Sequence, residues 1–190
     1  MSELYEKLYF HEIEIRDKLV ERLQVPLALI VSLMGALVYM LQNTALESPL
    51  PILVPYFFVL AVPAILLIAT AVTFFLSYYN YSYGLIPTAE QLEAYRQQLL
   101  ATYTEFDNGQ VLAEKYHREA LMNAFVECST INAATNAKRG GYIHTTNTLT
   151  LISAIFLLIA FVFFYLGGLD KNGLDTPKQI VISKPIELRR

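Results

Sequence analysis

The chain has 190 residues, of which 55% are hydrophobic and only 16% charged, whereas a soluble domain usually carries about 25% charged residues. Its formal net charge of −3 argues against a nucleic-acid-binding surface. Charged residues are absent from three long stretches, 25–42, 52–79 and 149–167. Because about 20 apolar residues in a helix cross the ~30 Å hydrocarbon core of a bilayer, the sequence predicts an all-α integral membrane protein with three transmembrane helices.

An amphipathic helix is predicted over residues 1–24. This segment has no Gly or Pro, and apolar residues recur on one helical face at Leu4, Leu8, Ile15, Leu19 and Leu23. A signal peptide has a short, basic leader, whereas six acidic residues precede the first apolar stretch. The segment is therefore interpreted as a helix that leads into the bilayer. Pro26 predicts a bend where the chain enters the membrane, because proline removes a helix hydrogen bond.

Residues 25–83 are predicted to form a transmembrane hairpin. Its two spans, 25–42 and 52–79, are separated by a short segment that contains Pro49 and Pro51, as expected for a tight turn. Pro63 lies inside the second span and predicts a kink. Aromatic side chains mark both ends of that span, as they do at membrane interfaces: Tyr56, Phe57 and Phe58 at one end, and Tyr78, Tyr79, Tyr81 and Tyr83 at the other.

Residues 84–148 are predicted to form a cytoplasmic helical hairpin. Thr88 and Gln91 have the spacing of a capping box, and Asp107-Asn108-Gly109 suits a turn. The single cysteine, Cys128, is expected to be a buried small side chain of this segment. No proline interrupts the second helix, so it is predicted to continue through Gly140-Gly141 into the third span, 149–168. The tail, 169–190, is predicted to be extended.

The distribution of Lys and Arg favours a cytoplasmic N-terminus. Three spans place residues 1–24 and 84–148 on one side, where nine Lys and Arg residues lie, against five in the tail on the other side. The alternative is a re-entrant third segment that leaves the tail inside.

A polar run before the third span holds the main candidate site. Asn132, Asn136 and Arg139 share one helical face, followed closely by Lys138, Gly140 and Gly141. One interpretation is structural: the amides join helices, and the basic pair anchors the cytoplasmic side. The other is a gate or a contact site for an anion or partner, with lipid phosphate as the commonest anion. The paired glycines are the expected hinge.

Catalytic residues, cofactors and metal ligands are not predicted. The three histidines are not spaced as a metal set, and neither a phosphate loop nor a nucleophile elbow is found. The spans offer only hydroxyl groups, interpreted as interhelical hydrogen-bonding groups or as the lining of a pore shared by several copies. These pore-lining candidates are Ser32, Thr70, Thr73, Thr150 and Ser153.

The layout resembles that of small membrane effectors of bacterial anti-phage systems, such as retron-associated transmembrane proteins and SLATT-type effectors. The resemblance covers residues 1–167 and includes the Asn132-x-x-x-Asn136-x-x-Arg139 run. It implies an effector in the bacterial inner membrane that a partner holds silent until it permeabilises the membrane.

The leading hypothesis is therefore a pore-forming, homo-oligomeric effector whose partners are the bilayer and a cytoplasmic regulatory protein. A non-conducting anchor that recruits a cytoplasmic protein is the alternative. A small subunit of a transporter or sensor complex comes third, and a lipid-modifying enzyme fourth.

Overall fold

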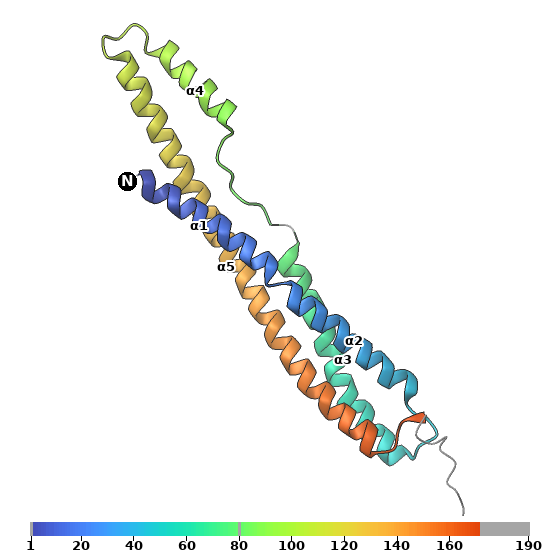
Figure 1. The fold of residues 1–190 in the computed structure, drawn as a ribbon. Coiled ribbons are helices and arrows are strands. Elements are labelled where there is room, and N and C mark those ends of the chain that lie inside the picture. The colour runs from blue at the N-terminus through green and yellow to red at the C-terminus, as the bar shows by residue number, and fades with distance from the viewer. Residues whose placement is uncertain (1, 80, 172–190) are drawn as a thin grey trace, which may run out of the picture. The chain divides into compact units, whose positions relative to one another are not determined.

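The protein is described by a computed structural model over residues 2–79 and 81–171. These described residues form five helices in chain order: α1 (Ser2–Glu21), α2 (Gln24–Asn43), α3 (Leu50–Tyr78), α4 (Ala89–Thr102) and α5 (Gly109–Leu166) (Figure 1). The described residues contain no β-strand beyond one isolated bridge between Thr44 and Asp170. The prediction of an all-α chain is confirmed, whereas the predicted extended tail lies outside the described residues from position 172 onward.

In the part of the chain that the structure describes, three helical stretches are long and apolar enough to cross a membrane, within residues 3–43, 50–78 and 109–166. The last of these is α5, a single helix of 58 residues that passes through Gly140 and Gly141 without interruption. The predicted continuity from the hairpin into the third apolar stretch is therefore confirmed. A Cβ atom added at either glycine would meet nothing within 4 Å, so packing does not require glycine at these positions.

The helix is interrupted just before Pro26, close to the predicted bend. The N–H of Leu23 bonds to the carbonyl of Val20 at 3.2 Å, which is a tightened turn, and α2 then begins at Gln24. Since proline has no N–H, position 26 cannot continue the hydrogen-bond ladder back to Arg22. The local chemistry of proline thus accounts for the boundary between α1 and α2.

The described residues fall into two compact units, one within residues 2–30 and 68–150 and the other within residues 31–67 and 151–171. In the first unit α1 packs on α5, where the Tyr9 and Phe125 rings lie 5.7 Å apart beside Cys128. Cys128 is buried, as predicted. The second unit has an apolar core from α2, α3, α5 and the segment just after α5, formed by Met40, Leu53, Tyr56, Leu60, Leu157, Ala160, Phe164 and Leu169.

From Asn132 onward, the buried positions of α5 recur at alternating intervals of four and three residues. They are Asn132, Asn136, Arg139, Ile143, Thr146, Thr150, Ser153, Leu157, Ala160 and Phe164. α3 has the same spacing from Leu53 to Thr70. A mean period of 3.5 residues is the repeat of left-handed coiled-coil packing. The N-terminal half of this α5 seam is mostly polar, so burial there depends on hydrogen bonding as well as on apolar contact.

The hairpin of α4 and α5 is held by aromatic contacts at its tip. Thr88 caps α4 together with Gln91, as the sequence predicted. The Tyr103 ring stacks on Tyr116 at a centroid distance of 5.5 Å, and α5 starts at Gly109, where a Cβ atom would overlap the Tyr103 carbonyl. None of the α4 residues is buried, so the hairpin presents much of this helix on its surface.

Candidate functional site

The polar run of α5 forms a buried cluster. Asn132, Asn136 and Arg139 are 0%, 5% and 4% exposed, and all three face the same side of the helix. Their partners come from α1, from the end of α3 and from the extended segment 81–87. The sequence therefore located the face correctly, and the structure adds the partners.

The side-chain amide of Asn132 forms two hydrogen bonds with the backbone of Gly84. Its Oδ1 accepts from the Gly84 N–H at 2.8 Å, and its Nδ2 donates to the Gly84 carbonyl at 3.1 Å. A Cβ atom at position 84 would lie 2.9 Å from the Cα of Cys128, closer than packed atoms tolerate. Gly84 is thus needed for the close approach of segment 81–87 to α5.

Tyr83 links Asn136 to Arg139 through its hydroxyl group. That hydroxyl donates to Asn136 Oδ1 at 2.9 Å and accepts from Arg139 Nη1 at 2.7 Å. Asn136 Nδ2 donates in turn to the carbonyl and to the carboxylate of Glu12, at 2.8 and 2.9 Å. This chain of bonds joins α1, segment 81–87 and α5 in the first unit.

Arg139 also caps the C-terminus of α3. Its Nε donates to the Ser77 carbonyl at 3.1 Å, one of the last four carbonyls that a helix leaves without an internal partner. A cation there is favoured by the negative end of the helix dipole. The guanidinium carbon lies 5.2 Å from the centroid of the Tyr81 ring and 5.9 Å from that of Tyr83. Within the described residues Arg139 makes no ion pair, so neutral groups and π-faces balance its charge.

The other three residues of the run lie outside this cluster. Lys138 is exposed, Gly140 half-buried and Gly141 exposed. Lys138 lines a separate cavity of about 240 Å³ together with Phe75, Leu76, Tyr79, Tyr81 and Tyr142. Burial raises the pKa of the Tyr81 phenol, the neighbouring Tyr142 raises it further, and Arg139 lowers it.

The pore-lining candidates are mostly enclosed by the chain itself. Thr70, Thr150 and Ser153 are at most 4% exposed. Thr150 donates to the Thr146 carbonyl at 2.8 Å, and Thr73 accepts from the Thr146 hydroxyl at 3.0 Å. Ser32 is exposed. The hydroxyl groups of Thr70, Thr150 and Ser153 therefore lie on buried faces of their helices, whereas Ser32 lies on the surface of α2.

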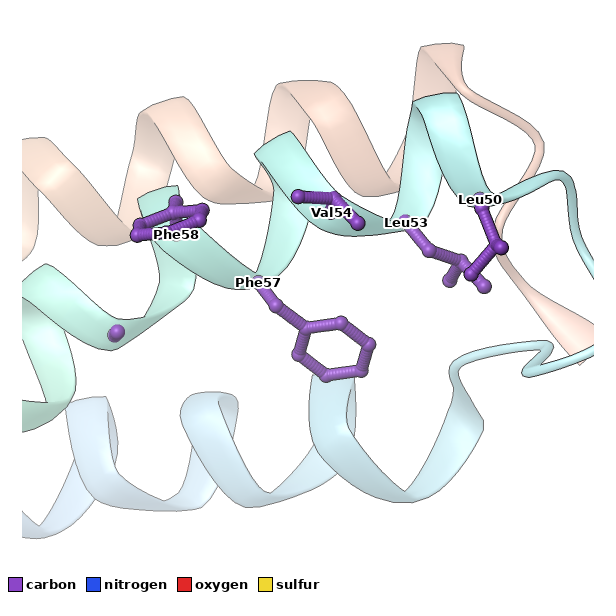
Figure 2. A pocket seen from close by; sticks show the side chains of 6 residues that line it. Leu50, Leu53, Val54, Phe57 and Phe58 are labelled. Atoms are coloured by element: carbon purple, nitrogen blue, oxygen red, sulfur yellow. The ribbon is translucent and has the colours of Figure 1, made fainter.

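An apolar groove runs along the first half of α3 in the second unit. Figure 2 shows its lining side chains projecting from one helix, with Phe57 directed away from the α3 axis. The groove has a volume of about 410 Å³ and is lined by Leu50, Leu53, Val54, Phe57, Phe58 and Ala61. Such a surface accommodates hydrocarbon and offers no group for acid–base or nucleophilic chemistry.

Across the residues that the structure describes, no three His, Cys, Asp or Glu side chains gather as a metal site. His117 lies on the hairpin, with its ring 6.3 Å from that of Tyr95, and its buried Nε2 has no hydrogen-bond partner there.

Glu93 is exposed, and hydrogen bonds from Arg96 and Gln97 lower its pKa to about 2, so it is ionised at physiological pH.

No protein-family model matches this chain, and neither a characterised protein nor a solved structure shows significant similarity to it.

Sequence reasoning missed four partners of the cluster: Glu12, Ser77, Tyr83 and Gly84. The sequence pattern places Tyr83 in an interfacial aromatic belt and Gly84 at the start of the next segment. The proximity of Tyr83 and Gly84 to the apolar end of α3 was visible in the sequence, but their pairing with α5 bridges 48 or more positions.

Proposed function

We propose that the protein is a multi-pass membrane effector in which a helical hairpin outside the bilayer controls three transmembrane helices. The observation that carries the proposal is the unbroken course of α5 from Gly109 to Leu166. A continuous helix transmits a displacement of its exposed end along its length, because its hydrogen-bond ladder resists bending. A partner that moves the hairpin can thereby change the packing of the apolar helices.

The proposed output is permeabilisation of the bacterial inner membrane by an oligomer, in the setting of anti-phage defence. The resemblance in layout to membrane effectors of such systems supports this setting. Ser32, exposed on α2, is the pore-lining candidate compatible with a surface shared between copies. The buried hydroxyls of Thr70, Thr150 and Ser153 would line a pore only after the helices that bury them separate.

A non-conducting anchor that recruits a soluble protein is the second candidate. It is favoured by apolar side chains that remain on the surface of the hairpin: Tyr95, Phe106, Val111 and Tyr116 are 38%, 57%, 68% and 39% exposed. Exposed aromatic groups of this kind are enriched at protein–protein interfaces. An anchor and an effector share this docking surface and differ in whether the membrane becomes leaky.

Inducible expression in a bacterial host, followed with a membrane-potential dye, separates the two functions. The effector proposal predicts depolarisation and growth arrest on induction, relieved by the co-expressed partner. Because each Gly→Ala change in a helix stabilises it by about 1 kcal/mol and neither glycine is packed, the double change Gly140→Ala and Gly141→Ala should stiffen α5 and alter depolarisation. Gly35→Ala, equally unpacked on α2, is the control. Normal potential at high membrane expression, with partner and phage present, would favour the anchor.

A further inference from the structure

The cavity beside Lys138 combines a cation, phenol groups and apolar walls. Phe75 and Leu76 come from the last turns of α3, Tyr79 and Tyr81 follow that helix, and Lys138 and Tyr142 lie one turn apart on α5. The Phe75 and Tyr79 rings stack with centroids 5.0 Å apart, which gives the cavity one flat aromatic wall. All six lining residues belong to the first unit.

The charge of this cavity is positive and uncompensated. Lys138 makes no ion pair or hydrogen bond within the described chain, and no carboxylate lines the cavity. The neighbouring Arg139 does not line the cavity, and its hydrogen-bond partners are neutral groups of the buried cluster. Glu12, the carboxylate of the adjoining polar cluster, is bonded to Asn136.

The donors that remain available have the chemistry of a phosphate site. Tyr81 is already engaged, since its hydroxyl donates to the Leu76 carbonyl at 2.7 Å. The Lys138 ammonium and the phenols of Tyr79 and Tyr142 have no hydrogen bonds within the described residues. An ammonium with nearby hydroxyl donors suits a phosphate oxygen, whereas Phe75 and Leu76 suit hydrocarbon.

The position along α3 fits the headgroup layer of a bilayer. With 29 residues at about 1.5 Å each, α3 is roughly 43 Å long, whereas the hydrocarbon core is ~30 Å thick and the bilayer with its headgroups ~40–45 Å. The ends of a helix of this length therefore reach the headgroups, where Lys and Tyr side chains settle.

We propose that the cavity lined by Lys138, Tyr79, Tyr81 and Tyr142 binds the headgroup of an anionic phospholipid, with Phe75 and Leu76 against its first acyl carbons. The inference relies on membrane insertion and is independent of whether the protein permeabilises the bilayer. It gives Lys138 a role distinct from that of the adjacent Arg139, whose side chain points about 100° further round the helix into the buried cluster.

Native mass spectrometry of the purified full-length protein, titrated with phosphatidylglycerol or phosphatidylcholine of identical acyl chains, tests the proposal. The wild type should prefer phosphatidylglycerol by about fivefold, the factor expected for one cation near a membrane surface. Lys138→Gln should abolish that preference. Lys115→Gln, which removes an exposed lysine from the same helix, should leave it unchanged.

Two results would overturn the proposal. One is an unchanged preference in Lys138→Gln. The other is displacement of the lipid by inorganic phosphate at equal concentration, which would make the cavity a site for free phosphate. The labelling rate of the buried Cys128 with a thiol dye verifies that each variant is folded.

Discussion

Arg139→Met is expected to destabilise the first unit by on the order of 3 kcal/mol. The change removes the charged donors to the Ser77 carbonyl and the Tyr83 hydroxyl, and hydrogen bonds to charged groups contribute about 1.5–3 kcal/mol each. It also leaves the end of α3 without its cation. For a chain of this size, the unfolding midpoint should fall by roughly 6–12 °C.

Cys128 provides the measurement for Arg139→Met. It is the single cysteine of the chain and is buried, so a thiol-reactive dye reports thermal unfolding in detergent. Arg118→Met, which removes an exposed arginine from the same helix, should shift the midpoint by no more than about 2 °C. If Arg139→Met has the same unfolding midpoint as Arg118→Met and the wild type, the buried polar cluster does not stabilise the first unit.

Asn132→Asp is expected to release segment 81–87 from α5 while the helices stay folded. Aspartate keeps an acceptor for the Gly84 N–H but has no donor for the Gly84 carbonyl, and it places a charge where the side chain is fully buried. Burying an unpaired charge is costly. Because Gly84 packs directly against Cys128, the dye should label Cys128 faster at a temperature well below unfolding.

The expected acceleration is about 30-fold, which corresponds to about 2 kcal/mol of lost local stability. Asn123→Asp is the matched control, since Asn123 is exposed on the same helix. Equal labelling rates for Asn132→Asp and Asn123→Asp would show that segment 81–87 does not depend on the Asn132 amide.

The helices and their order were predictable because they follow from local chemistry. Charge-free stretches mark the apolar helices, Thr88 and Gln91 mark the start of α4, and Pro26 lies just after an interruption. Even the passage of α5 through Gly140-Gly141 follows from the absence of a stronger helix breaker.

The polar seam of α5 was only half predictable. Helical spacing placed Asn132, Asn136 and Arg139 on one face. The burial of that face could not be predicted, because a pattern of apolar residues cannot identify a buried face whose side chains are polar. The partners of that face depend on tertiary contacts across 48 to 124 positions. Adjacent residues of the run also differ in a way that their sequence does not show. Lys138 is exposed, whereas its neighbour Arg139 is buried on the adjacent side of the helix.

Three membrane crossings can be tested most directly by determining on which side of the membrane each turn lies. In a Cys128→Ala background, Glu47→Cys probes the turn between α2 and α3, and Asp107→Cys probes the tip of the hairpin; both positions are exposed. Three crossings with an inside N-terminus predict that an impermeant maleimide labels position 47 in bacterial cells with a permeabilised outer membrane and an intact inner membrane, and labels position 107 only after lysis. Labelling of both positions before lysis, or recovery of the protein in the soluble fraction, would contradict the account.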